Sequence, residues 1–249
     1  MSKGAVHRNH LGQPVGEPVP GWSPRPRPPR TAMAGRFCTV EPLDPARHAA
    51  PLFAAYAEDR EGRLWTYLPR GPYATLDEYR NWAEAACRTD DPLVHTIIDN
   101  AAGTPVGTAS YLRIEPAIGV IEVGSITYSP RLQRWPAATE AMYLMMRRIF
   151  EELGYRRYEW KCDSLNEPSR NAAARLGFRY EGLFRQASMT RGRNRDTAWF
   201  SVIDKGWPAL RAAFEAWLDP ANFDSDGHQL RSLSSLRDAP GSAQSAAQG

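Results

Sequence analysis

The sequence predicts an α/β (α+β) fold, with a mixed, twisted central sheet of about six to seven strands flanked by helices. The main observation is that short β-type runs alternate with amphipathic helical segments, in the order β-α-α-β-β-β-α-β-α-β-β. The second is a set of helix-start signals at the expected boundaries. A length of 249 residues with 42% hydrophobic residues is enough for one domain with a substantial core.

The first predicted element is a strand at Arg36–Val40. Asp44 followed by Pro45 then predicts a helix, because an N-cap residue before a proline at the first helical position is a common helix start. Thr75 and Glu78 have the spacing of a capping box and open a second helix. The predicted buried face of this second helix is Leu76, Tyr79, Trp82, Ala83 and Ala86.

Three strands are predicted next, at Leu93–Asp99, Pro105–Arg113 and Val120–Tyr128. Each is rich in β-branched or aromatic residues and is bounded by turn residues. Gly124 interrupts the third strand, which indicates a β-bulge or a close approach of the backbone to another group.

The longest predicted helix begins at Ala137 or Ala138 and ends at Leu153, with Gly154 as the expected C′ residue. Asn166 is expected to cap a further helix. The remaining elements are strands at Arg157–Cys162, Phe178–Arg185 and Asp196–Ile203 and a last helix from about Pro208 to Leu218.

Both ends of the chain differ in composition from the middle. Residues 1–35 hold seven of the 21 prolines and five Lys or Arg against one acidic residue, whereas residues 223–249 form a low-complexity tail rich in Ser, Ala, Gln and Gly. Neither end has enough apolar residues to form a core, so both are predicted to be disordered. The folded domain is therefore assigned to residues 36–222, whose charges cancel.

The sequence argues against several classes of protein. No apolar run approaches the ~18–20 residues of a membrane helix, and the N-terminus lacks the apolar region of a signal peptide. The three cysteines are widely spaced and the five histidines lack metal-ligand spacing. We therefore expect a cytoplasmic protein with no disulfide and no metal. The neutral domain argues against a nucleic-acid partner, and a homodimer stays open.

A strand–helix junction is the first candidate for a binding site. The strand that ends in Ile126, Thr127 and Tyr128 leads through RLQRWPAAT into the longest helix. A helix N-terminus presents unbonded N–H groups and the positive end of the helix dipole, which suits a phosphate or pyrophosphate. The candidate residues for binding this group are Gln133, Arg134, Trp135, Ala137, Ala138 and Thr139. Taken alone, the pattern also fits an ordinary strand–helix turn.

A second segment, 33 residues after Gln133, begins with NEPS at Asn166 and ends with GF at Gly177. Together the two segments resemble the GNAT family of acetyl-CoA-dependent N-acetyltransferases. In that family [QR]-x-x-G-x-[GA] opens one helix, and N-x-x-[AS] opens another that ends in GF. The order of elements over residues 36–207 also matches. The LWTYLPRGPY loop and the closing RDTAWFSVIDKGWP are similar to the RimJ/RimL-like branch.

Two positions depart from the family pattern. Pro136 stands where the first motif has its first glycine. Because proline has no N–H, that phosphate contact is lost or replaced, with Arg134 as the expected replacement. Ala173 stands where many members carry a tyrosine that protonates the departing thiolate, so the tyrosine mechanism is absent. These departures motivate the alternative of a sensor or scaffold that binds acyl-CoA with weak or no catalysis.

The resemblance implies that an acetyl group passes directly from acetyl-CoA to a primary amine. The backbone of Ile126–Tyr128 would hold the acyl oxygen and the pantetheine arm where the strand splays. Ser169 is the candidate that hydrogen-bonds the CoA sulfur, or else a first-turn serine bonded to the backbone. Asn166 would hold a pantetheine amide and can be a plain N-cap as well. Glu122 is the candidate general base, with a cross-strand or solvent-facing carboxylate as the alternative.

The resemblance places the acceptor amine beside the loop between the first two helices. There Trp65, Tyr67 and Tyr73 stack on the substrate or fill the core under the loop. An α-amine with a pKa near ~7.7–8.0 needs only a weak base, whereas a lysine amine near ~10.4 needs a stronger one. The acceptor stays open between a protein N-terminal α-amine and a small-molecule amine.

Overall fold

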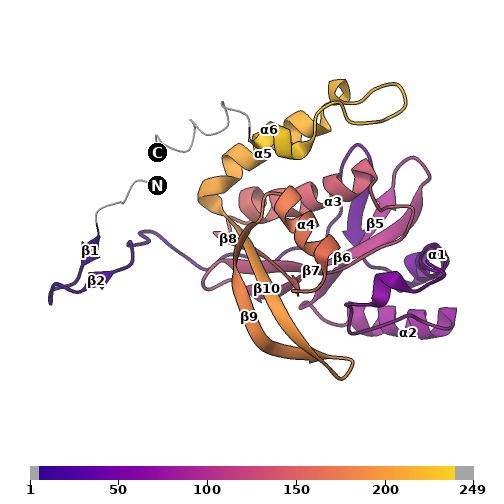
Figure 1. The fold of residues 1–249 in the computed structure, drawn as a ribbon, viewed down its shortest axis with the longest axis horizontal. Coiled ribbons are helices and arrows are strands. Elements are labelled where there is room, and N and C mark those ends of the chain that lie inside the picture. Colours follow the sequence, from indigo (N-terminus) through magenta and orange to yellow (C-terminus); the bar gives the residue numbers. More distant parts are fainter. Residues whose placement is uncertain (1–5, 239–249) are drawn as a thin grey trace.

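The computed structural model describes residues 6–238 and contains one large mixed sheet (Figure 1). Its eight strands lie in the order β3-β4-β5-β6-β7-β8-β10-β9, and β7 and β8 are the parallel pair. The strands are β3 Met33–Ala34, β4 Cys38–Pro42, β5 Leu93–Asp99, β6 Thr104–Glu115, β7 Val120–Tyr128, β8 Arg157–Asp163, β9 Arg179–Thr190 and β10 Arg193–Ile203. The predicted fold class is confirmed, and β3 is an additional strand.

Two apolar clusters cover opposite faces of the sheet. Helices α3 (Pro136–Arg147), α4 (Glu167–Arg175) and α5 (Trp207–Leu218) pack over the larger cluster. Helices α1 (Pro45–Tyr56) and α2 (Leu76–Cys87) pack over the smaller one, mainly against β6 and β5. We call these the α3 face and the α1 face. None of the helices in residues 6–238 is long and apolar enough to cross a membrane.

The predicted helix starts are confirmed. The side chains of Asp44, Thr75 and Asn166 each accept a backbone N–H from the first turn of α1, α2 and α4, respectively. Helix α3 begins close to the predicted residue and continues into a π-helical turn, Arg148–Glu152. Gly154 then takes a φ of 68°, in the left-handed region where glycine ends helices at low cost.

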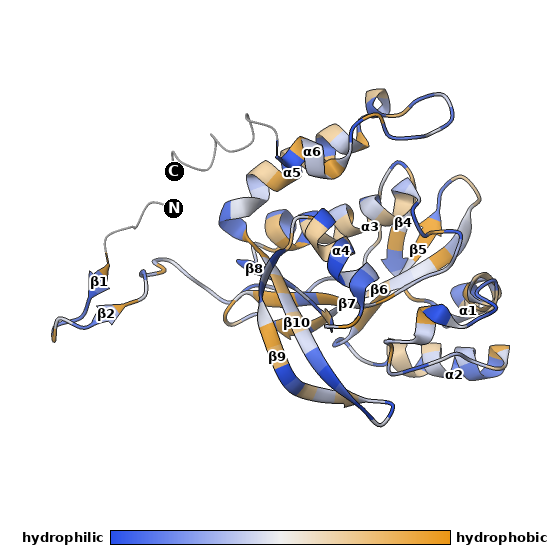
Figure 2. Ribbon diagram, in the orientation of Figure 1, coloured by the Kyte–Doolittle hydropathy of each residue, from blue (hydrophilic) through white to orange (hydrophobic). Residues whose placement is uncertain are grey.

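The hairpin formed by β9 and β10 is longer than the sequence predicts. The gap between the two predicted strands, residues 186–195, shrinks to Arg191 and Gly192, because cross-strand pairing continues to Thr190 and Arg193. Figure 2 shows that the far end of this hairpin is largely hydrophilic. Strand β9 is the edge of the sheet and is mostly exposed, so it lacks the alternation of buried and exposed residues that sequence patterns detect.

The structure differs from the predicted disorder of residues 1–35. The Trp22 indole donates to a carbonyl of the β6–β7 turn at 2.8 Å, Arg148 donates to the Thr31 carbonyl at 2.8 Å, and Met33 is buried in the core. These anchors are isolated residues in or just after a proline-rich stretch, so no periodic hydrophobic pattern predicts them. Farther toward the N-terminus, β1 (His7–Arg8) and β2 (Pro14–Val15) form a small hairpin that extends away from the body (Figure 1).

The folded unit also extends beyond the predicted boundary at residue 222. A short helix, α6 (Leu233–Arg237), packs against α5 and buries Leu233 and Leu236 in the α3-face cluster. These two leucines and the hydrogen bond from Arg237 to the Ala174 carbonyl, at 2.6 Å, anchor this turn. The rest of the predicted disordered segments, residues 1–5 and 239–249, lies outside the described residues.

Candidate active site

The parallel pair β7–β8 separates partway along its length. Residues Val120–Val123 pair in register with Arg157–Trp160, and the pairing ends there. Strand β7 continues to Tyr128 beside β6, and β8 continues to Asp163 beside β10. The two strand ends therefore diverge. Beyond Val123 and Trp160, the backbone groups of β7 and β8 that face each other are not paired. We call this feature the divergence.

A β-bulge marks the divergence on β7. The register with β6 shifts between Gly124 and Thr127, and Ser125 takes a φ of 49°, which is rare for a residue with a side chain. The Arg70 guanidinium donates to the Ser125 carbonyl and to the Thr127 hydroxyl, both at 3.2 Å. The Tyr56 hydroxyl donates to the Thr127 carbonyl at 3.2 Å. The predicted irregularity near Gly124 is confirmed, and side chains from α1 and the following loop hold it.

Glu122 lies on the α1 face of β7, because its neighbours in sequence belong to the α3-face core. It is only 5% exposed. The Lys161 ammonium lies 2.9 Å from Oε2 of Glu122 and 2.7 Å from Oε2 of Glu159. The Arg113 guanidinium is 3.6 Å from the same Glu122 oxygen. We call Glu122, Glu159 and Lys161 the charge cluster.

The charge cluster changes the acidity of Glu122. Burial raises the pKa of this carboxyl group above its ordinary value, Lys161 and Arg113 oppose the rise, and Glu159 adds to it. A raised pKa suits a base that accepts a proton near neutral pH. A depression of about 430 Å³ borders the cluster, lined by Arg113, Glu115, Ile118, Val120, Glu159 and Trp199.

Ser169 and Asn166 lie on the α3 face, at the N-terminus of α4. Ser169 Oγ accepts a hydrogen bond from the Trp160 indole at 3.0 Å, and its backbone N–H donates to Asn166 Oδ1 at 3.2 Å. Trp160 is the last residue of β8 that pairs with β7. The Ser169 hydroxyl therefore lies next to the divergence, on the face opposite Glu122.

The predicted phosphate-binding junction forms the first turn of α3. Pro136 is at the first helical position, and in the described part of the chain neither Arg134 nor Ala137 donates its backbone N–H. Arg134 takes a φ of 62°. Arg175 of α4 donates to the Thr139 hydroxyl at 3.0 Å, which brings a cation to this turn. The exposed candidates are Gln133, Arg134 and Trp135, and the buried ones are Ala137, Ala138 and Thr139.

The loop between α1 and α2 uses its aromatic residues in two ways. Trp65 is 4% exposed and packs edge-on against Tyr56 and Tyr73, with both centroid distances 5.5 Å, which favours the core-packing alternative for Trp65. The Tyr67 hydroxyl instead donates to a carbonyl of the β8–α4 loop at 3.0 Å. Arg191, at the tip of the β9–β10 hairpin, donates to carbonyls of the same α1–α2 loop. The loop is thus tied to both of its neighbours.

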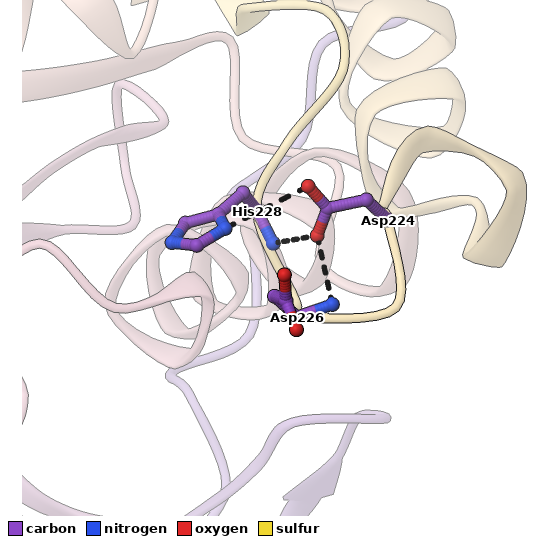
Figure 3. Close-up of side chains that lie close together, drawn as sticks. All are labelled: Asp224, Asp226 and His228. Atoms are coloured by element: carbon purple, nitrogen blue, oxygen red, sulfur yellow. Dashed lines mark hydrogen bonds and ion pairs between the residues drawn. The ribbon is translucent and has the colours of Figure 1, made fainter.

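Within residues 6–238, one group of side chains has the spacing of metal ligands: Asp224, Asp226 and His228, between α5 and α6 (Figure 3). All three are exposed. Asp224 Oδ1 accepts the backbone N–H groups of Asp226 and His228, at 3.0 and 2.8 Å. These bonds account for the loop as an ordinary turn.

The divergence of β7 and β8 and the first turn of α3 are thus the two features of a candidate binding site, and the helix N-terminus suits a phosphate. A model of the acetyltransferase (GNAT) domain matches residues 38–179, and the chain therefore belongs to the GNAT acetyltransferase family. The general reaction of this family is acetyl-CoA-dependent N-acetylation.

Solved structures agree with this assignment. A GCN5-related N-acetyltransferase from Brucella melitensis is 49% identical over 89% of this chain and 100% of its own, with a TM-score of 0.87. A probable GNAT-family acetyltransferase from Chromobacterium violaceum is 37% identical over 79% and 98%, with a TM-score of 0.73. RimL, a ribosomal L7/L12 alpha-N-protein acetyltransferase in complex with coenzyme A, shares the fold at 20% identity over 70% and 98%, with a TM-score of 0.60. No match is found among curated proteins.

Four cationic residues at the site are absent from the sequence prediction: Arg70, Arg113, Lys161 and Arg175. For Lys161 a signal existed, because alternation in β8 puts it on the same face as Glu159. Arg70 and Arg175 bond partners 57 and 36 positions away, so no local pattern points to them.

Proposed function

We propose that the protein transfers an acetyl group from acetyl-CoA directly to a primary amine, either a protein N-terminal α-amine or a small-molecule amine. The observation that best supports this is the divergence of β7 and β8, with Glu122 and Ser169 on its opposite faces. In this proposal the CoA arm comes from the α3 face and the amine from the α1 face. The two substrates then meet between the strands.

The reaction uses few groups. The amine nitrogen attacks the thioester carbonyl carbon, and Glu122 accepts the proton that the nitrogen loses. The carbon–sulfur bond breaks, and its electron pair leaves with the thiolate, which the Ser169 hydroxyl stabilises by a hydrogen bond. Backbone N–H groups of Ile126–Tyr128 stabilise the acyl oxygen, and Asn166 holds a pantetheine amide.

The first turn of α3 binds the pyrophosphate in this proposal. Backbone N–H groups of Arg134 and Ala137 are the donors, since Pro136 has none. The exposed Arg134 side chain replaces the phosphate contact that a backbone N–H at position 136 would make. Arg175 adds a second positive charge beside Thr139. The exposed Gln133 and Trp135 complete the set.

The acceptor lies in this proposal on the α1 face, near Tyr67 and Tyr73 and the depression beside the charge cluster. Trp65 supports this surface from within the core rather than by contact. The RimJ/RimL-like branch stays a proposal that rests on the sequence motifs. Three free cysteines, two of them buried, support a reducing, cytoplasmic location.

The first test is a thermal shift with acetyl-CoA compared with a CoA fragment that lacks the pyrophosphate. A ligand at 100 times its Kd adds about 2.7 kcal/mol to the free energy of unfolding. We expect a raised Tm with acetyl-CoA, a smaller rise with the fragment, and a weaker rise in Arg134→Gln. Arg131→Gln is the matched control, because Arg131 is paired with Glu58.

Turnover then separates the proposal from its alternative. Mass spectrometry of peptides with free and blocked N-termini, and of polyamines, detects the added acetyl group. Acetylation of any of these amines supports the proposed function. Binding without turnover favours the sensor or scaffold alternative, and no Tm change at millimolar acetyl-CoA contradicts both.

A further inference from the structure

We propose that Lys161 is the positioning residue of the candidate base, because it holds Glu122 as a carboxylate and keeps one of its oxygens on the side of the divergence. This inference rests on the proposed function, in which Glu122 accepts the proton of the amine. Lys161 itself touches neither substrate in this scheme. It acts through Glu122.

The strand register brings the three groups of the charge cluster together. Glu122 and Glu159 are partners in the parallel pair, and Lys161 is two residues beyond Glu159, on the same face of β8. The ammonium lies between the two carboxylates, at 2.9 and 2.7 Å. All three side chains are at most 8% exposed, so water does little to stabilise any of these charges.

An aromatic ring fixes the ammonium from a third side. Trp199 is the partner of Lys161 on β10, and Nζ of Lys161 lies 3.8 Å from the centre of its ring. Phe184 of β9 stacks on Trp199 with a centroid distance of 4.5 Å. Lys161 is therefore held on β10 as well as on β7 and β8.

The two oxygens of Glu122 have different surroundings. Oε2 is the oxygen that Lys161 and Arg113 approach. Oε1 lies toward Gly124, where an added Cβ would come within 3.2 Å of it. Because Gly124 is the first residue past the paired part of β7, Oε1 lies on the side of the divergence. A side chain at Gly124 would crowd Oε1 and the Leu112 side chain, whose Cδ2 would lie 3.1 Å from the added Cβ.

Removing the ammonium would leave two buried carboxylates side by side, and Glu159 would keep Arg157 as a partner at 2.7 Å. The proton that such a pair takes up would therefore go to Glu122. A protonated Glu122 cannot accept the proton of an amine. The charged groups that face Glu122 are Lys161 and Glu159 on β8 and Arg113 on β6. The Arg113 side chain is 61% exposed, at 3.6 Å, so solvent weakens its effect and Lys161 supplies most of the compensation.

The test is a titration of the Glu122 carboxyl in the full chain without substrates, followed by carbon-13 NMR and assigned with Glu122→Gln. Lys161→Met removes the ammonium and keeps a chain of similar length, so we expect the pKa of Glu122 to rise by about 1–3 pH units. Glu159→Gln removes the neighbouring negative charge, so we expect the pKa to fall. With an acceptor, the acid limb of the kcat profile moves in the same two directions while KM for acetyl-CoA is unchanged.

Opposite shifts in the two variants support the positioning role. Shifts in one direction, or none, in variants that still bind acetyl-CoA contradict it. If Lys161→Met does not fold, Glu159→Gln decides, because a rise or no change there overturns the proposal. A wild-type chain that acetylates no amine contradicts the proposed function instead, and the NMR titration still shows whether Lys161 controls Glu122.

Discussion

Two buried glutamates, one where α3 meets the N-terminal segment and one at the divergence, are stabilised in different ways. Glu140 is 4% exposed and accepts the backbone N–H groups of Arg36, Phe37 and Cys38 at 2.7, 2.6 and 2.8 Å. Glu122 is 5% exposed and lies against an ammonium and a guanidinium. The exposed fractions are nearly equal, but the partners differ: neutral backbone N–H groups bind Glu140, and charged side chains lie against Glu122.

The difference separates a structural carboxylate from one suited to proton transfer. Backbone N–H groups are fixed in place and give up no proton near neutral pH, so Glu140 joins α3 to the start of β4 permanently. The Gly35 backbone also packs so closely on Glu140 that no side chain fits there. Glu122 has partners that tune its charge and leave one oxygen toward the divergence. The same residue type thus serves stability in one region and, we propose, chemistry in the other.

The largest effect is expected from Glu122→Gln. An amide cannot accept the amine proton, so kcat should fall about 10²–10⁴-fold. The free energy of unfolding should change little, because Lys161 keeps Glu159 as its partner. Steady-state kinetics and urea unfolding measure the two quantities on the same preparation. A variant with wild-type kcat would remove Glu122 from the mechanism.

The matched substitution Glu140→Gln should show the reverse. Its amide NH₂ would face the donors at Arg36–Cys38, and we expect the free energy of unfolding to fall by about 3 kcal/mol. The kcat of the folded fraction should stay at the wild-type value, measured below the unfolding transition. A fall in kcat without a loss of stability would contradict the purely structural role of Glu140.

The same contrast shows what the sequence predicts. The strands at Leu93–Asp99 and Val120–Tyr128 and the capping box of α2 were predictable because their signals lie within a few residues. The N-terminal segment was not, since the carbonyl that Trp22 bonds is 95 positions away. The motifs led to Glu122 and Ser169 as candidates, and their catalytic roles stay predictions. The role of Lys161 needed the register between β7 and β8, which no local pattern contains.

The smallest effect on stability is expected at a third glutamate, Glu181, which lies beside the charge cluster. Arg157 bridges Glu159 and Glu181, and its bond to Glu181, with help from Ser201, lowers the pKa of Glu181 to about 2. Because this pKa is below the ordinary value of 4.5, the stabilisation is present above about pH 4.5 and is lost as the pH falls toward 2.

The Glu181 side chain is 37% exposed, and solvent therefore screens the pair. We expect Glu181→Gln to lower the free energy of unfolding by about 1 kcal/mol or less at pH 7. The loss should be smaller at pH 3, because the unfolded chain is then already protonated at this position while the folded chain is not. Urea unfolding of both proteins at the two pH values measures the difference. A larger loss at pH 3 would mean that Glu181, like Glu122, is shielded from water and belongs with the buried carboxylates.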